Sequence, residues 1–432
     1  MDKKFKGSFK DWLIVVLFSF SAFSFWKLSS NKIGAEESNR KSATDQSIYE
    51  KINLFNEVMK KVSDNYVYEV SDEELIMRAI KWMVNSLDPF SAYMSPAELK
   101  DMEVETRGQF GGLGIEITKK DYYILVITPI EDTPAWRAGI LPGDRIIKID
   151  GEPTRDMTVQ DAVRRLRGQK GTKVVITIER SGWDEPKDIE LIRDIIKVKS
   201  VRASTIEKDI LYVRLTNFQE RTSDDLLDTL KKSGLYEGKI KGVILDLRSN
   251  PGGLLSEAIK VGDLFVGDEV IVSTRGRNSS KDYRGRKERN DFPAGVSLVV
   301  LVNRGSASAS EIVAGAIKDN KKGIIVGQRT FGKASVQTII PISNGGALRL
   351  TTAHYYTPLG TNIEEKGIQP DILFKPKGEE RSFTEMTPQE ILERRQHPEY
   401  DEEVKFAISI IRGEPLKVKQ NQKEPISEES ED

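Results

Sequence analysis

The spacing of apolar residues changes three times along the chain. In residues 52–62 and 75–83, apolar side chains recur every three or four positions, which is typical of amphipathic helices. Ser71 and Glu74 form the pattern of a capping box at the start of the second stretch. We therefore predict an N-terminal helical region over residues 46–105, which the segment LDPFSAYM interrupts.

From about residue 107 the pattern consists of short apolar runs between glycine turns. GGLGIEI, YYILVITPI, GDRIIKIDG and KVVITIER have the composition of strands. Thr158 and the following DAVRRLR predict one short, capped helix. The sequence thus predicts a compact, mainly β module over residues 106–196.

Strands and helices alternate over residues 197–375. Continuous apolar runs such as VSLVVLV are typical of strands buried on both faces. This alternation predicts an α/β domain with a largely parallel sheet. Residues 376–432 are charged, with a helical pattern around EEVKFAISII and a final stretch whose composition is typical of disorder.

The N-terminus has the features of a membrane signal. Four lysines precede an apolar run from Trp12 to Trp26, and a basic N-terminal flank places the following chain outside the membrane. No convincing A-x-A cleavage pattern follows the run. We predict an uncleaved signal anchor over residues 1–28 and a polar linker over 29–45.

Composition narrows the possible chemistry. The 66 Lys and Arg residues balance 67 Asp and Glu residues, so charge gives no sign of a nucleic-acid binder. The chain has no cysteine, which excludes thiol nucleophiles and zinc–thiolate sites. Of its two histidines, His397 lies in the charged tail, so a Ser-His-Asp triad would require His354.

The segment from Gly327 to Lys333 reproduces most of a phosphate-binding loop. However, Ala334 stands where the magnesium-binding hydroxyl belongs, and SVQTIIPI reads as a strand where that loop opens a helix. A nucleotide-dependent enzyme is therefore disfavoured, and Lys333 is left for another task.

Three serines alternate with alanine in NRGSASASEI, at a strand-to-helix junction. Helix capping accounts for one serine. A serine at such a turn also exposes its Oγ beside backbone N–H groups that stabilise an oxyanion. The local pattern leaves both explanations open for Ser306, Ser308 and Ser310.

Lys333 is a candidate general base for such a serine. On a strand, Gln337 would share its face and orient its amine. A basic lysine must be neutral, so burial must lower its pKa from about 10.4 towards 7–8. Phe331, Val336 and Ile339 are candidates for the apolar surroundings.

Two glycine turns are candidate binding elements. RSNPGGLL places Gly252 and Gly253 after a core strand, where one N–H is a candidate for half of an oxyanion hole; an ordinary turn is the simpler explanation of this motif alone. In the β module, GGLG precedes an edge strand and can present N–H groups to a terminal carboxylate, unless the module merely packs.

Taken in order, these motifs resemble a known family. RGQFGGLGIEI and AGILPGDRIIKIDG resemble a PDZ domain. With LDPFSAYM, DLRSNPGG, NRGSASASEI, GQRTFGKASVQ and TPLGTNIEEKGIQPD, the chain resembles the bacterial carboxyl-terminal processing (tail-specific) proteases over nearly its whole length.

The resemblance implies a role for each candidate residue. Ser308 matches the nucleophile, Lys333 the general base and Gln337 the residue that orients the base. Backbone N–H groups of Ala309 and Gly252 match the oxyanion hole. The PDZ carboxylate loop corresponds to Gly111, Gly112, Leu113 and Gly114.

The resemblance also implies a fold and an activity. It predicts a Clp-protease/crotonase-like α/β core with an inserted PDZ domain, and a serine endopeptidase that needs no cofactor or metal. Its partners would be proteins with unfolded or apolar C-terminal tails, the membrane and a second copy of the chain, in the bacterial envelope with the bulk facing the periplasm. The alternative is a catalytically silent PDZ adaptor for such tails.

Overall fold

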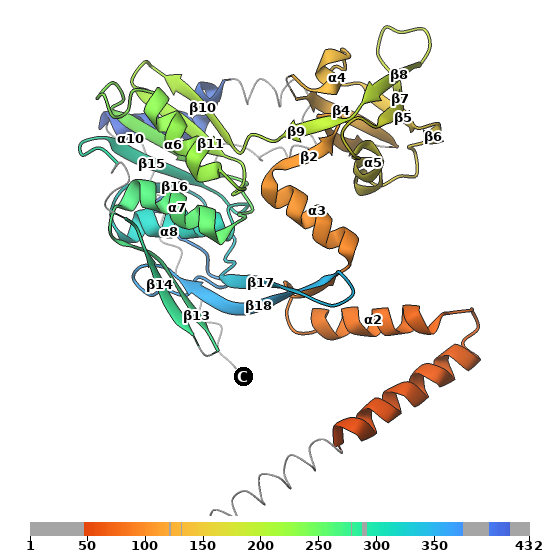
Figure 1. Ribbon diagram of the computed structural model, residues 1–432. Helices are drawn as coiled ribbons and strands as arrows, with labels where there is room; N and C mark the ends of the chain where they lie inside the picture. The colour runs from red at the N-terminus through yellow and green to blue at the C-terminus, as the bar shows by residue number, and fades with distance from the viewer. Residues whose placement is uncertain are drawn as a thin grey trace, which may run out of the picture. The chain divides into compact units, whose positions relative to one another are not determined.

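The computed structural model describes residues 47–120, 122–130, 132–277, 279–286, 292–374 and 397–414 (Figure 1). Contacts divide the chain into one unit that ends at Ser86 and a larger unit that begins at Leu87. Among the described residues no helix is long and apolar enough to cross a membrane. The predicted anchor and linker lie outside these residues.

The first unit consists of a helix over residues 47–65 and helix α2 (Asp72–Asn85). The Ser71 side chain accepts a hydrogen bond from the Glu74 N–H at 3.2 Å, so the predicted cap is present. Helix α3 (Pro96–Arg107) belongs to the second unit, and Ser95 and Glu98 cap it reciprocally.

The mainly β module forms an antiparallel sheet in the order β3-β4-β5-β7-β8, with β6 paired to β5. A separate pair, β2 (Gln109–Gly112) with β9 (Asp194–Lys197), joins the two ends of the module, as an inserted domain requires. The other bounds are β3 Ile115–Lys120, β4 Tyr123–Pro129, α4 Pro134–Arg137, β5 Arg145–Ile149, β6 Glu152–Pro153, α5 Val159–Leu166, β7 Lys173–Glu179 and β8 Lys187–Ile192.

The core sheet has the order β10-β11-β12-β15-β16-β19 and is parallel from β11 onwards. Its strands are β10 Val201–Ile206, β11 Ile210–Leu215, β12 Gly242–Asp246, β15 Ser297–Val302, β16 Ile324–Gly327 and β19 Ile372–Leu373. The surrounding helices are α6 Thr222–Lys232, α7 Leu255–Val266, α8 Ala309–Asp319, η1 Pro398–Tyr400 and α10 Glu402–Arg412.

The core sheet has helices on both faces, which gives the domain three layers. Val300 and Val302 pack with residues of α6, α7 and α8, whereas Val299 and Leu301 pack with α10. Successive side chains of a strand point to opposite faces, so β15 is buried on both sides as its apolar run predicted. The α10 helix also confirms the helical pattern expected in the charged C-terminal region.

A second, antiparallel sheet stands apart from the core sheet. It contains β1 Ala92–Met94, β13 Val270–Gly276, β14 Ser280–Arg284, β17 Ser335–Pro341 and β18 Ala347–Tyr356. The SVQTIIPI segment is a strand, as predicted, and it pairs antiparallel with β18 in this second sheet. The LDPFSAYM segment also joins this sheet through β1. The fold is α/β with an inserted β module, as predicted.

Candidate active site

Two turns meet where β12 and β15 end. The strands are neighbours and parallel, so their carboxyl ends lie on the same edge of the sheet, where ligands of α/β proteins bind. Asn250, which is fully buried, joins the turns. Its carbonyl accepts hydrogen bonds from the Ala307 N–H and from Ser310 Oγ, each at 3.0 Å.

The glycine turn lies directly against the serine turn. Gly252 has a φ of 103°, and a Cβ there would lie 2.8 Å from the Cβ of Ser308 and 3.0 Å from the Ala309 nitrogen. Only glycine allows this approach. The Gly252 N–H donates to Asn250 Oδ1 at 2.9 Å, whereas the Gly253 and Ala309 N–H groups have no acceptor among the described residues.

The structure separates the three serines. Ser306 Oγ donates to the Leu247 carbonyl at 2.8 Å, and Ser310 Oγ is bound to Asn250. Both residues are fully buried, so both hold the turns together. Ser308 lies between them and is half-buried. It takes the N-cap position of α8, opposite Glu311 as in a capping box, with no side-chain cap hydrogen bond to hold its Oγ.

Ser308 also has an unusual backbone conformation. Its φ is 55° and its ψ is −113°, a region that residues with a side chain rarely adopt and that costs free energy. Such strain persists where the surroundings hold it and is concentrated at functional sites. Of the three serines, Ser308 alone has this conformation, and it alone is not fully buried.

A buried carboxylate, that of Glu311, ties the serine turn to the lysine loop. It accepts hydrogen bonds from the N–H groups of Ser308, Gly332 and Lys333 at 2.8, 2.7 and 3.0 Å. Thr330 Oγ1 donates to it at 2.5 Å. Burial raises the pKa of Glu311 while these four hydrogen bonds oppose the shift. The sequence suggested only a first-turn acidic residue at this position.

Tyr355 on β18 makes a second connection between the same segments. Its hydroxyl lies 3.1 Å from the Ser308 carbonyl oxygen and also contacts the Lys333 carbonyl oxygen. Burial raises the pKa of Tyr355 well above its usual value, so the hydroxyl keeps its proton. Tyr355 comes from a strand far along the chain, and no local motif pointed to it.

Lys333 is half-buried in the loop between β16 and β17. Burial lowers its pKa, and nearby Arg349 adds to this shift, while Glu364, Asp88 and Glu311 oppose it. This is the direction that a general base requires. Phe331 does not supply the surroundings, since its side chain is 58% exposed. The aromatic ring beside Lys333 Nζ is that of Phe90, with its centroid 4.5 Å away.

The prediction that Lys333 and Gln337 share one face of a strand is wrong. Strand β17 begins at Ser335, after the lysine, and its register shifts between Val336 and Gln337. The Gln337 amide nitrogen instead donates to Ser335 Oγ at 2.9 Å and to Thr351 Oγ1 at 3.4 Å. Among the described residues there is no hydrogen bond between Lys333 Nζ and Gln337 or Ser308.

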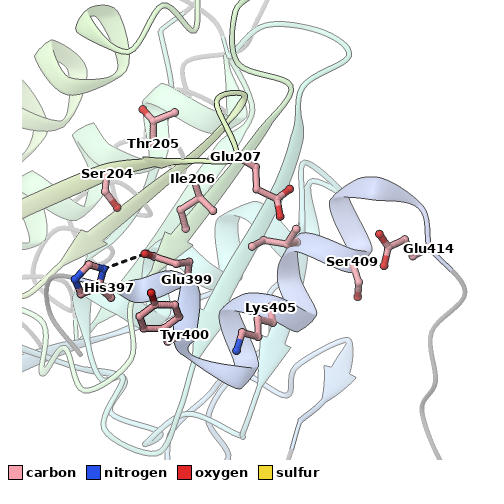
Figure 2. Close-up of a pocket in the computed structure, with 11 residues that line it drawn as sticks. Ser204, Thr205, Ile206, Glu207, His397, Glu399, Tyr400, Lys405, Ser409 and Glu414 are labelled. Carbon is pink, nitrogen blue, oxygen red and sulfur yellow. Dashed lines mark hydrogen bonds and ion pairs between the residues drawn. The ribbon is translucent and has the colours of Figure 1, made fainter. Parts of the chain in front are cut away.

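Neither histidine is placed as a base for Ser308. His354 Nδ1 lies 3.3 Å from Glu364 Oε2 on the second sheet. His397 Nδ1 lies 3.0 Å from Glu399 Oε1. His397 lines a cavity of about 840 Å³ between β10 and α10 that contains none of the predicted site residues (Figure 2).

The glycine loop of the β module is shorter than the sequence suggested. Gly111 and Gly112 lie in strand β2 and pair with β9. Leu113 and Gly114 form the loop before β3, and their N–H groups have no acceptor within the described chain. Strand β3 pairs only with β4 and is an edge of its sheet. The loop and the strand edge therefore remain available to an extended peptide.

An α/β core that presents a serine at a strand-to-helix turn, beside an inserted β module with an open edge strand, has the features of a peptidase. Comparison with known proteins agrees. Residues 209–374 match peptidase family S41, residues 125–180 match a PDZ domain, and residues 15–97 match the N-terminal domain of the activating protease CtpB.

Individual relatives carry the same description. A carboxy-terminal-processing protease of Bartonella bacilliformis is 49% identical over 331 residues, which cover 76% of each chain. The carboxy-terminal processing protease CtpA of Bacillus subtilis is 36% identical over 77% of this chain and 70% of its own. The solved photosystem II D1 C-terminal processing protease is 30% identical and covers 75% of this chain and 93% of its own, with a TM-score of 0.46.

The chain therefore belongs to the carboxy-terminal processing serine proteases with a PDZ domain.

Proposed function

We propose that the protein is an endopeptidase in which Ser308 is the nucleophile and Lys333 its general base. The observation that carries this proposal is the joint anchoring of both residues. The Glu311 carboxylate binds both backbone N–H groups, and the Tyr355 hydroxyl contacts both carbonyl oxygens. Two segments held this tightly together present their side chains to the same space.

Proton transfer requires one rotation. In the structure Lys333 Nζ rests on the Phe90 ring, and catalytic hydrogen bonds often tighten only when substrate binds. The neutral amine turns to Ser308, removes the hydroxyl proton as Oγ attacks the scissile carbonyl, and returns a proton to the leaving amine. Lys333 then activates the water that hydrolyses the resulting ester. Gln337, on the strand that follows the lysine loop, orients the amine in this position after its amide leaves Ser335 and Thr351.

The developing oxyanion has backbone donors beside it. The Ala309 N–H is the first of α8, where the helix dipole also favours negative charge. The second donor comes from the glycine turn. The family resemblance implies Gly252, whose N–H must leave Asn250 Oδ1 to serve. Gly253 has an N–H without an acceptor among the described residues and is the alternative donor.

Substrate tails are captured by the PDZ domain. A C-terminal carboxylate binds at the N–H groups of Leu113 and Gly114, and the preceding residues add to the edge of β3 opposite α5. The side chains of Ile115 and Ile117 on this strand pack partly against the apolar core of the module, which favours an apolar tail.

The activity assay uses an unfolded test protein with a free, apolar C-terminus. We expect the parent to cleave it without nucleotide and Lys333→Ala to lose at least about a hundredfold in rate, within the range of general-base effects. Lys405→Ala is the matched control, because Lys405 also lies over an aromatic ring, that of Tyr400.

A C-terminal amide on the substrate tests tail capture. Equal cleavage by Lys333→Ala contradicts the mechanism, and tail binding without cleavage by the parent supports the adaptor.

We further propose an envelope protein that is anchored by residues 1–28 and dimerises through its N-terminal helices. The helix over residues 47–65 supports the second part, because Ile52, Phe55 and Val58 on its apolar face are 49, 46 and 51% exposed. Sedimentation of the parent and of Phe55→Asp tests the dimer. The proposal is contradicted if the variant forms dimers to the same extent as the parent. Extraction of the protein from membranes by alkaline carbonate, without detergent, contradicts the anchor.

A further inference from the structure

The aromatic ring on Lys333 comes from a distant part of the chain. Phe90 lies in the turn between α2 and β1, and its ring centroid is 4.5 Å from Lys333 Nζ. A cation over a ring face is attracted to the ring's negative quadrupole. Within the described chain, Lys333 Nζ makes this ring contact and no hydrogen bond or ion pair.

The turn that carries Phe90 is fixed at its acidic end. Asp88 Oδ1 accepts the N–H groups of Phe90 and Ser91 at 2.8 Å each, and Thr351 Oγ1 of β18 donates to it at 3.1 Å. Burial alone would raise the pKa of Asp88, but the hydrogen bonds outweigh it and lower the pKa. The aspartate therefore stays charged and keeps the turn on β18.

A second attachment fixes the backbone of Phe90 itself. Arg349 Nε donates to the Phe90 carbonyl at 3.0 Å. Arg349 also stands opposite Ala92 in the β1–β18 pair. Two side chains and a strand pairing thus fix the backbone that carries this half-buried ring.

We propose that Phe90 is a positioning residue for the general base. Its ring face holds the Lys333 ammonium off Ser308 until substrate binds and stabilises the charged form of the amine, which sets the pH at which the base becomes active. This inference rests on the proposed role of Lys333.

Other charged groups also face Lys333 and must be kept unchanged in a test. Arg349 on β18 disfavours the ammonium, whereas Glu364, Asp88 and Glu311 favour it. The Tyr355 hydroxyl contacts the lysine carbonyl. Substitution of Phe90 removes none of these groups, so a change in the titration of Lys333 can be assigned to the ring.

The test is the pH dependence of kcat/KM of the full-length enzyme, whose acid limb reports the base of the free enzyme. Phe90→Leu keeps an apolar side chain but removes the quadrupole, so the ammonium loses stabilisation. We expect its acid limb to move to lower pH by about 0.4–1.5 units. Phe90→Trp, which keeps an aromatic face, should restore the parent limb or move it higher. Phe331→Leu, the same change on an exposed side chain near Lys333, should leave it unmoved.

The inference is overturned if the acid limb of Phe90→Leu is unchanged or lies at higher pH. A limb at higher pH would mean that the ring only excludes water, because removing such a ring raises the pKa of Lys333. If Phe90→Leu is inactive, the Lys333 pKa is measured instead by NMR with lysine labelled at Cε, in the Ser308→Ala background. A pKa equal to or above that of Ser308→Ala alone also overturns the inference. The proposed function fails separately, if Lys333→Ala remains active.

Discussion

Two buried carboxylates lie near the carboxyl ends of neighbouring strands, and they are satisfied in opposite ways. Asp246 ends β12 and is surrounded by arginines. Glu311 lies in the first turn of α8, which follows β15, and is surrounded by N–H groups and a hydroxyl. Both residues are fully buried. One of them fixes structure, whereas the other, on the mechanism that we propose, positions the reacting groups.

Asp246 is part of an ion-pair network. Arg248 binds it with Nη2 at 2.7 Å and Nε at 3.0 Å, and the Tyr212 hydroxyl donates to it at 2.7 Å. Arg248 also reaches Asp401 and Glu403 of the α10 region. Burial alone would raise the pKa of Asp246, but the arginine charges outweigh it and hold the pKa well below its usual range. The network attaches α10 to the sheet.

Glu311 has no cation within hydrogen-bonding distance among the described residues, and its pKa is raised. Its four donors come from the serine turn and the lysine loop. A buried charge with such partners is less stable than one beside arginine. Its carboxylate instead connects the backbone of Ser308 with that of Lys333.

The largest effect is expected from Asp246→Asn. This change keeps the shape and removes the charge that compensates Arg248 and Arg214, and the loss of one partner in a buried pair costs about 3–5 kcal/mol. Chemical denaturation should show this loss, with kcat close to the parent in the fraction that remains folded. A loss below about 1 kcal/mol contradicts the assigned role.

A smaller effect, of a different kind, is expected from Glu311→Gln. The amide has one acceptor oxygen in place of two and adds donors that face other donors, so about two of the four hydrogen bonds are lost. Stability should fall by about 1–3 kcal/mol. We expect kcat to fall about 10- to 100-fold with KM for tail substrates unchanged, since a small misplacement of catalytic groups costs this much. Steady-state kinetics that show full kcat would remove Glu311 from the account.

The smallest effect is the pH dependence of stability, and its sign differs between the two carboxylates. The lowered pKa of Asp246 gives stability that is present above its unfolded pKa of about 3.8 and is lost as pH falls through the lower folded value. The raised pKa of Glu311 gives stability that is present below about 4.5 and is lost as pH rises through the higher folded value. Parent-minus-variant unfolding free energies, measured with Asp246→Asn and Glu311→Gln, should therefore change with pH in opposite directions. Parallel curves contradict the comparison.

Much of the fold was predictable because its periodicity is local. The run VSLVVLV predicted a strand buried on both faces, and Thr158 predicted the cap of α5, which the Thr158–Asp161 capping box confirms. The pairing of strands was less predictable. SVQTIIPI has the composition of a strand in any sheet, and only its long-range partner β18 places it outside the core.

The candidate site divides in the same way. Ser308, Lys333 and the glycine turns lie in short motifs that mark them as candidates, and the resemblance to the protease family implies their individual roles. Glu311, Tyr355 and Phe90 act through contacts between segments far apart in sequence, and their own neighbours carry no sign of this. The strand argument for Gln337 failed for a related reason, because Lys333 precedes β17 and a bulge separates the two residues.

The most direct test of the central claim is a double-mutant cycle on Ser308 and Lys333. Rates of cleavage of one unfolded, free-tailed substrate are compared for Ser308→Ala, Lys333→Ala and the double variant, each checked for folding. Residues that act as one catalytic unit give grossly non-additive losses. The account predicts that the double variant is no slower than the slower single variant. Losses that multiply would show that Ser308 and Lys333 act independently and would contradict the dyad.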